Sequence, residues 1–369
     1  MIVMKFGGTS VGSAAAIRRV SQIIQSRLER KPVIVVSAVA KTTDDLVSLF
    51  KAASQQDQEI IDVLITRIIQ RHHELIDELQ LKSDTQLQAV IERAESHLRE
   101  TCAAMVEQNI GSRQYSDAIV STGEFLSSNI LAAYLRSQNI SSEMTDARDM
   151  LTTDSQFGKA VPDVDESLSA IREVLIPKTG DGIVPVIQGF IGSDREGRTT
   201  TLGRGGSDYS ATLFGRMLDA DAVEIWTDVD GVMTADPTLV PNVKRIRKMT
   251  FQEAAELAYF GARVLHPATL LPAIEQGIPV FVLNSMRPDD SGTEIIPSLT
   301  GKKRTGALVK SIAYKEGLTV ITIKSTRMLM AYGFMAKIFE VFNRYKTAVD
   351  LVSTSEVSVR SEERRVGKE

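Results

Sequence analysis

Two glycine-containing loops in this sequence could hold a phosphate or another anion. The first is KFGGTS at residues 5–10, which joins a short apolar segment to a helical pattern. Glycines let the backbone approach a phosphate closely, and the free amides at a helix N-terminus favour anions. Lys5 adds a positive charge, although the spacing is not that of a Walker A loop. The alternative is a tight strand-to-helix turn with a surface lysine.

The second loop is TLGRGGSD at residues 201–208, and it also opens a helical segment. Arg204 could bind a carboxylate through two hydrogen bonds. Asp208 could orient a catalytic lysine or help to hold a metal. The alternative is a loop whose helix is capped by Ser207 or Asp208. Two such loops in one α/β domain favour the functional interpretation.

Two further acidic positions follow expected strands. Glu124, in STGE at residues 121–124, could pair with a substrate ammonium or complement the dipole of the helix that it begins. The segment WTDVDG at residues 226–231 could hold a nucleotide and its magnesium, or form a turn on Asp-Gly. Ligands of open α/β sheets bind beyond the carboxyl ends of the strands, which favours a functional interpretation of both.

The histidines and the single cysteine do not form a recognisable catalytic or metal-binding site. We expect His72, His73 and His97 to be solvated on a polar helical segment, and His266 to cap a helix. The single cysteine, Cys102, excludes an internal disulfide and a cysteine metal cluster. No metal site made by the protein alone is predicted.

The composition is that of a globular protein of two domains, at roughly 150 residues each. The chain has 369 residues, with 43 Lys and Arg against 47 Asp and Glu. Its net charge of -4 gives no reason to expect nucleic-acid or membrane partners. No apolar run reaches the roughly 18 residues of a membrane span. We expect a soluble protein of the reducing cytoplasm.

The apolar pattern predicts a mostly parallel sheet between helices. A strand at residues 2–6, a helix with Ile17, Val20 and Ile24 on one face, and a strand at residues 33–36 form a βαβ unit. Residues 44–110 read as a lobe of helices. Further strands are expected at residues 117–121, 183–191, 222–226 and 279–283. Further helices are expected after Glu124 to about residue 135, and at residues 210–218 and 251–265.

The segment at residues 291–306 is polar and rich in glycine, and we expect it to link two domains. Residues 1–290 would form the first. Residues 307–359 would form a small α/β unit, with strands at 319–324 and 349–352 and a helix at 333–345. Residues 360–369 form a highly charged tail that does not fit this pattern.

These segments together resemble the aspartate kinases. The first loop, the block GRTTTLGRGGSDYSA at residues 197–211 and FGARVLHP at residues 260–267 are similar to that family in the same order. The resemblance implies an amino-acid kinase fold followed by regulatory ACT modules, which are ferredoxin-like. Residues 307–359 resemble the first part of one ACT module, of the monofunctional lysine-sensitive type.

The resemblance implies that ATP, with Mg²⁺ as cofactor, phosphorylates the β-carboxylate of L-aspartate to 4-phospho-L-aspartate. This is the first step towards lysine, threonine and methionine. Alternatives are another amino-acid kinase, or an amino-acid-binding regulator without catalysis. By position, Lys5 and Asp208 would be catalytic. The implied ATP contacts are Lys5, Gly7, Gly8, Ser10, Thr227, Asp228 and Arg263. The implied aspartate contacts are Thr43, Glu124, Arg204 and Ser207.

The resemblance also implies a lysine effector and, in the intact family, a homodimer. The implied effector contacts are Met328, Gly333, Phe334, Val349, Asp350, Ser355 and Glu356. We expect this site to be impaired, because the module looks partial and would leave a free strand edge after residue 359. Met233, Thr238 and Arg263 depart from the usual tyrosine, arginine and lysine, and Thr238 puts the strength of nucleotide binding in question.

Overall fold

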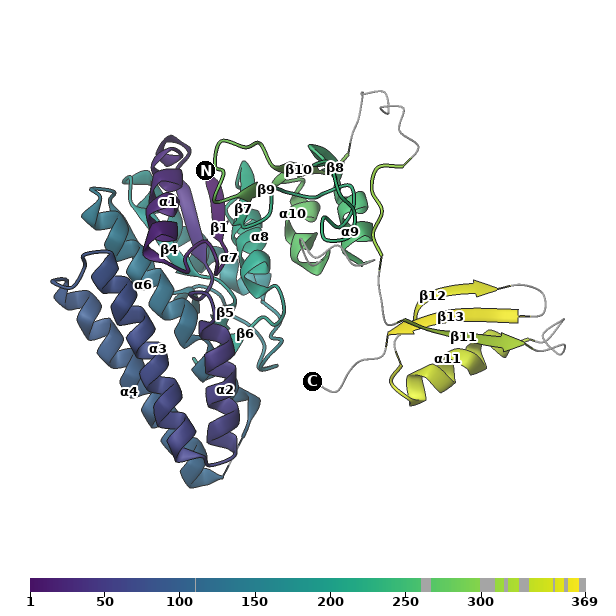
Figure 1. The fold of residues 1–369 in the computed structure, drawn as a ribbon, viewed down its shortest axis with the longest axis horizontal. Helices are drawn as coiled ribbons and strands as arrows, with labels where there is room; N and C mark the ends of the chain where they lie inside the picture. Colours follow the sequence, from purple (N-terminus) through teal and green to yellow (C-terminus); the bar gives the residue numbers. More distant parts are fainter. Residues whose placement is uncertain are drawn as a thin grey trace. The chain divides into compact units, whose positions relative to one another are not determined.

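The computed structural model divides the chain into two compact units, unit 1 over Met1–Ile312 and unit 2 over Ala313–Glu369 (Figure 1). The structure describes residues 1–109, 111–259, 267–298, 309–314, 318–324, 332–347, 349–354 and 358–364. Each unit has a sheet of its own.

An eight-stranded sheet forms the centre of unit 1, in the order β3-β4-β2-β1-β7-β9-β10-β8. Neighbouring strands are parallel except β9 and β10, which are antiparallel. The predicted α/β fold with a mostly parallel sheet is therefore confirmed. The strands are β1 (Ile2–Phe6), β2 (Pro32–Val36), β3 (Ser142–Thr145), β4 (Val184–Gln188), β7 (Ala222–Thr227), β8 (Lys248–Thr250), β9 (Val280–Asn284) and β10 (Thr293–Ile296). A separate hairpin pairs β5 (Ile191–Ser193) with β6 (Thr199–Thr201).

Helices cover both faces of this sheet (Figure 1). The alternation of β1 explains why: Ile2 and Met4 join one apolar cluster with residues of α1 and α6, whereas Val3 joins a second with residues of α7 and α8. A strand buried on both faces is largely apolar, as β2 is throughout and β1 is except for Lys5. The helices of unit 1 are α1 (Ala14–Gln25), α2 (Thr42–Ser54), α3 (Gln58–Glu78), α4 (Thr85–Gln108), α5 (Arg113–Val120), α6 (Thr122–Ser137), α7 (Val164–Gly180), α8 (Gly206–Met217), α9 (Phe251–Tyr259) and α10 (Leu271–Gln276).

The predicted helical lobe is confirmed as α2, α3 and α4, but one expectation within it is wrong. His72 is 0% exposed. Its Nδ1 lies 2.7 Å from the carbonyl oxygen of Ile68, and its Nε2 has no partner. His72 lies on the face of α3 that also buries Ile68 and Leu75. Its position on the helix therefore decides its burial, although its side chain is polar. Burial lowers the pKa of His72 to about 4.

Three segments differ from the predicted elements. Residues 117–121 are not a strand: Asp117 to Val120 end α5, because a short run such as DAIV has no period that separates helix from strand. The expected strand at 183–191 divides into β4 and β5, with Phe190 at a φ of 72° between them. Residues 293–296, inside the expected linker, are strand β10, in which Thr293 and Ile295 are fully buried.

Unit 2 contains a three-stranded antiparallel sheet in the order β11-β13-β12 and one helix, α11 (Phe334–Arg344). The strands are β11 (Leu318–Lys324), β12 (Val349–Thr354) and β13 (Ser358–Arg364). The strand β13 continues the chain after residue 359 and pairs with both other strands, and among the described residues β11 and β12 are the edge strands of this sheet. Residues 360–364 of the expected tail belong to this central strand. The charged side chains hid this strand from the sequence pattern. Strand pairing depends on backbone hydrogen bonds, which charged residues can make as well as apolar ones.

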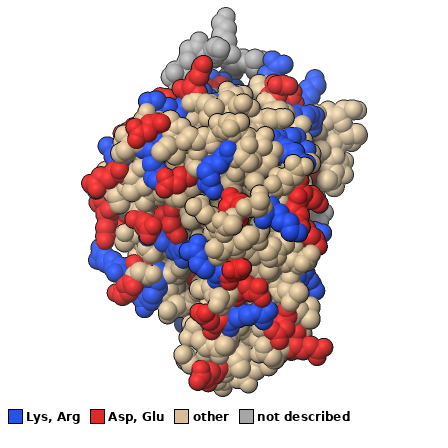
Figure 2. All heavy atoms as spheres, turned by 90° about the vertical axis from the view of Figure 1, so that its left-hand side faces the viewer, with Lys and Arg blue, Asp and Glu red and all other residues tan. Residues whose placement is uncertain are grey.

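Among the described residues, no helix is long and apolar enough to span a membrane. Figure 2 shows cationic and anionic side chains intermingled over the face that it draws. Such a mixture creates no extended field of one sign, in agreement with the near balance of 43 basic and 47 acidic residues.

The buried His72 should make unit 1 sensitive to acid. Its pKa is lowered from 6.5 to about 4, so the unfolded chain binds a proton more readily between these values, and stability falls as the pH falls. By pH 4 the loss from this group is about 3 kcal/mol. Thermal unfolding of wild type and His72→Met from pH 7 to pH 5 measures it: the variant should lose less stability over this range. His97→Met, at an exposed histidine, is the control and should behave as wild type. Equal acid sensitivity of all three proteins would contradict the prediction.

Candidate functional site

An ion pair between Lys5 and Asp208 lies at the carboxyl edge of the unit 1 sheet. Lys5 Nζ is 2.6 Å from Asp208 Oδ1, and the side chains are 11% and 17% exposed. Lys5 belongs to the central strand β1, and Asp208 to the first turn of α8. The two glycine-containing loops, about 200 residues apart in sequence, therefore meet at one place.

The first loop approaches its neighbours too closely for a side chain at Gly8. A Cβ atom there would lie 2.9 Å from the carbonyl oxygen of Ala38, in the segment after β2. The amide of Gly7 donates to the carbonyl oxygen of Trp226 at 3.1 Å, near the end of β7. Three adjacent parallel strands thus end in segments that contact one another.

Glu124 is a buried carboxyl group in the first turn of α6, with an exposed fraction of 4%. Its Oε1 accepts a hydrogen bond from the amide of Ala38 at 3.1 Å, whereas its Oε2 is buried without a partner. Burial raises the pKa of Glu124 to about 8, and the amide of Ala38 and the charge of Lys5 oppose this shift. A buried oxygen without a partner is costly, and a ligand that donates a hydrogen bond or carries a positive charge would relieve that cost.

Arg204 presents a positive charge without an ion-pair partner in the described part of the chain. It is exposed, and it lies between Gly203 and Gly205, whose φ angles are 77° and 73°. These positive angles are the left-handed conformation that glycine adopts at little cost. Ser207 follows in α8 and packs against Gly189, where a Cβ atom would lie 2.7 Å from the Cβ of Ser207. The loop therefore has a fixed backbone and a free cationic side chain.

The nucleotide residues implied by the resemblance lie along the same edge. Thr227 ends β7, and its Oγ1 donates to Asp228 Oδ1 at 3.2 Å. Ser10 is 2% exposed, and its Oγ lies 2.9 Å from the Oγ of Ser285. Ser10 thus joins the loop after β1 to the segment after β9. Arg263 lies outside the described residues.

Thr43, an implied aspartate contact, and Thr238, a departure from the family pattern, show no feature that points to a ligand. Thr43 is exposed in the first turn of α2, beside the buried Thr42. Thr238 donates to Asp236 Oδ1 through its amide at 2.8 Å and through its hydroxyl at 2.6 Å. A threonine therefore completes a local turn at the position where the family usually has an arginine.

Asn284 and Ser285 are members of this edge that the sequence analysis missed. Asn284 Nδ2 donates to Asp230 Oδ1 at 2.5 Å, and the amide of Ser285 donates to the carbonyl oxygen of Thr227 at 2.9 Å. Both follow the predicted strand at 279–283. Polar residues directly after an apolar strand are the signal that could have found them.

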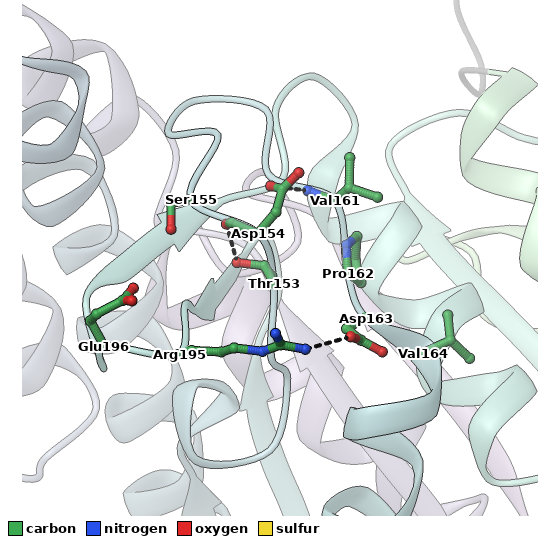
Figure 3. A pocket seen from close by; sticks show the side chains of 9 residues that line it. All are labelled: Thr153, Asp154, Ser155, Val161, Pro162, Asp163, Val164, Arg195 and Glu196. Carbon is green, nitrogen blue, oxygen red and sulfur yellow. Dashed lines mark hydrogen bonds and ion pairs between the residues drawn. The ribbon is translucent and has the colours of Figure 1, made fainter.

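A hollow of about 590 Å³ lies elsewhere in unit 1, beside the β5–β6 hairpin (Figure 3). Arg195 and Glu196 line one part of it, and the segments at 153–155 and 161–164 line the rest. Arg195 is already paired with Asp163 and Glu166. Neither Lys5, Glu124 nor Asp208 lines this hollow, so it is separate from the candidate site.

Among the described residues of unit 2, the expected effector positions lie around the start of α11 and β12. Gly333 precedes the helix with a φ of 76°, Phe334 begins it, and Val349 and Asp350 begin β12. Met328, Ser355 and Glu356 lie outside the described residues.

Comparison with known proteins identifies relatives of this chain. Residues 1–284 match the Amino acid kinase family. Lysine-sensitive aspartokinase 3 of Escherichia coli is 38% identical over 97% of this chain and 77% of its own length. Aspartokinase 1, chloroplastic, of Arabidopsis thaliana is 39% identical over 97% of this chain and 62% of its own length. The crystal structure of E. coli aspartokinase III in complex with aspartate and ADP (R-state) has a TM-score of 0.85 and 37% identity, and the match covers 100% of this chain and 79% of that chain.

The parallel sheet with its two glycine-containing loops, together with these matches, places the chain in the amino acid kinase family. Within that family it belongs to the aspartokinases. The resemblance stated from the sequence motifs is thereby confirmed.

The contact between Gly189 and Ser207 provides a test of the site geometry. In Gly189→Ala the new methyl would lie 2.7 Å from Ser207 Cβ and 2.9 Å from its Cα, so the first turn of α8 must shift. We expect kinase activity to fall by about 100-fold while the protein stays folded, because small displacements of positioned groups are costly to catalysis. Steady-state activity and thermal unfolding measure the two effects. Gly180→Ala, at a position with no atom within 4 Å, is the control. Full activity of Gly189→Ala would show that the position of Ser207 is unimportant.

Proposed function

We propose that unit 1 uses ATP to phosphorylate the β-carboxylate of L-aspartate, giving 4-phospho-L-aspartate. The observation that carries the proposal is the Lys5–Asp208 ion pair, whose lysine charge acts on the unsatisfied Glu124 and whose aspartate follows the exposed Arg204 in the same loop and helix start. An amino acid carries one ammonium and one carboxylate on its α-carbon, and these two groups would match Glu124 and Arg204. The relative whose structure contains aspartate and ADP supports this choice of substrates.

The acceptor needs no general base. The side-chain carboxyl of aspartate has a pKa near roughly 4, so it is ionised at neutral pH and is ready to attack. The difficulty is the approach of one anion to another. Lys5, held beside the loop amides by Asp208, would offset this repulsion and stabilise the charge on the phosphoryl group in transfer.

Asp208 keeps the ammonium of Lys5 at the strand end. The pair is mostly buried, and an ammonium on a four-carbon stem would otherwise adopt several conformations. The Asp208 carboxylate lies in the first turn of α8, where the helix dipole favours negative charge. We propose that Asp208 orients Lys5 and that Lys5 contacts the phosphates.

Mg²⁺ is the proposed cofactor. The described residues contain no group of three or more His, Cys, Asp or Glu side chains that could hold a metal by themselves. The phosphate oxygens of ATP would therefore supply most of the ligands, and Asp208 and Asp228 are the two carboxylates of this edge that we propose could complete them. When bound, Mg²⁺ neutralises charge on the transferring phosphates.

Lysine is the proposed effector. This rests on the E. coli relative, which is named lysine-sensitive aspartokinase 3, and on the sequence resemblance of Gly333, Phe334 and Val349 to the family's effector positions. The homodimer implied by the resemblance stays a prediction.

Lys5→Met should abolish most phosphoryl transfer and leave the fold intact. The methionine keeps much of the side-chain volume but removes the charge, and the loss of one such electrostatic contact costs about 100-fold to 1,000-fold in turnover. Trapping of the acyl phosphate as a hydroxamate, with aspartate, ATP and Mg²⁺, measures the reaction. Near-normal turnover of this variant would contradict the assignment of Lys5.

Arg204→Ala, measured in the same assay, tests the aspartate side of the site as Lys5→Met tests the phosphate side. It removes a partner of the substrate carboxylate, so the KM for aspartate should rise by about tenfold, with a smaller effect on the KM for ATP. A raised KM for ATP alone would move Arg204 to the nucleotide side. A wild-type protein that forms no hydroxamate with aspartate would overturn the proposed function.

The raised pKa of Glu124 predicts that aspartate binds more tightly as the pH rises. Below pH 8 the empty site holds a proton on Glu124, and the ammonium of the substrate must displace it. The KM for aspartate should therefore fall between pH 6.5 and pH 8, with a slope of up to about tenfold per pH unit. The KM for ATP, measured in parallel, should change less. Glu124→Gln should bind aspartate weakly at every pH and lose this slope. A flat wild-type profile would contradict the prediction.

A further inference from the structure

Asp117 is a buried acidic residue that the proposed mechanism does not use. It lies near the end of α5 and is 2% exposed. Its carboxylate accepts three hydrogen bonds. Oδ2 accepts from the amides of Thr201 at 2.8 Å and Gly158 at 2.9 Å, and Oδ1 accepts from the hydroxyl of Thr201 at 2.9 Å.

These donors belong to two segments that form the base of the Arg204 loop. Thr201 ends β6, two residues before Gly203. The carbonyl oxygen of Thr201 accepts from the amide of Ala160 at 2.8 Å. The segment at 158–160 is therefore bonded to Thr201 through Ala160 and to Asp117 through Gly158. A Cβ atom on Gly203 would lie 3.1 Å from the carbonyl oxygen of Gly158, which places the turn directly against that segment. Asp117 thus fixes both the strand that leads into the turn and the segment that supports it.

The backbone of Asp117 connects to the helix that carries Glu124. The backbone carbonyl oxygen of Asp117 accepts from the amide of Ser121 at 3.1 Å, and α6 begins at Thr122. Glu124 lies in the first turn of that helix. Through its side chain and its backbone, one residue therefore connects the Glu124 helix with the Arg204 loop.

We propose that Asp117 is a positioning residue that sets the distance between Glu124 and Arg204, and so the fit of the site to the ammonium and carboxylate of its substrate. The inference rests on the proposed function for its substrate, but the connection itself does not. A carboxylate taken out of water is costly unless its oxygens are paired. Here both oxygens are paired, and three directed hydrogen bonds define one geometry in a way that an apolar side chain could not.

The nucleotide side has separate supports. Gly7 is held by Trp226 of β7, and Ser10 by Ser285, which directly follows β9. None of these contacts involves Asp117. A loss of the Asp117 contacts should therefore alter aspartate binding more than ATP binding.

Asp117→Ala, Asp117→Asn and the control Asp57→Ala form the test. Asp57 caps α3 by accepting from the amide of Ile60 at 3.2 Å, so its loss destabilises unit 1 away from the site. In Asp117→Ala the KM for aspartate should rise by about tenfold, with less than about a twofold change in the KM for ATP. Asp117→Asn should largely restore it, because the amide oxygen can accept from both backbone amides while the NH₂ group donates to the hydroxyl oxygen of Thr201. Asp57→Ala should leave both KM values unchanged.

Hydrogen exchange of the amides of Thr201 and Gly158 gives a readout that does not depend on activity. Both should exchange faster in Asp117→Ala than in wild type, and near the wild-type rate in Asp117→Asn. If Asp117→Ala does not fold, Thr201→Val replaces it, since that change removes only the hydroxyl contact and should give a smaller rise in the same KM.

Equal rises of both KM values, or an Asn variant as impaired as the Ala variant, would overturn the proposal. Unchanged exchange at Thr201 and Gly158 would overturn it as well. A wild-type protein inactive with aspartate, with exchange altered as expected, would instead overturn the proposed function and leave the connection standing.

Discussion

A parallel sheet that is covered on both faces leaves polar groups only one place to gather, the edge where its strands end. The five residues of β1 and the five of β2 are buried throughout. Lys5 is tolerated in β1 because its ammonium extends past the strand end to Asp208. The register of β1 with β2 and β7 then brings Val36 and Trp226 level with Phe6, so the segments that follow all three strands meet. The position of every group in the site depends on that alignment.

The polar groups in and around the site fall into two kinds. Ser10, Asn284 and Asp117 are buried and have partners within the protein, and they hold segments together. Glu124 and Arg204 differ from them. One has a buried oxygen without a partner, and the other has a charge without one in the described part of the chain. The unpaired oxygen of Glu124 is buried and costs stability, whereas the charge of Arg204 is exposed to water. The contrast separates residues that hold segments together from Glu124 and Arg204, the two groups that the proposed function assigns to the substrate.

Much of this arrangement was predictable from the sequence. Apolar runs that end in glycine or in a polar residue located β1, β2, β7 and β9, and the two glycine loops located Lys5 and Asp208. Local patterns failed where the deciding contact is distant. Asp117 and its neighbours read as a strand, although their place is set by hydrogen bonds to residues 158 and 201. His72 read as solvated, because its burial depends on how α3 packs. Residues 358–364 read partly as a tail, because pairing with β11 and β12 is decided by backbone groups and not by side-chain polarity.

The chain contains one tryptophan, and its place gives the protein a built-in optical reporter. Trp226 is fully buried, stacks on Phe6 with ring centroids 6.1 Å apart, and donates from its indole nitrogen to Glu224 at 3.1 Å. Its own carbonyl oxygen receives the amide of Gly7. Indole fluorescence therefore arises from unit 1 alone, next to the first glycine loop. Emission from this one residue can follow the unfolding of unit 1 separately from that of unit 2, without a label.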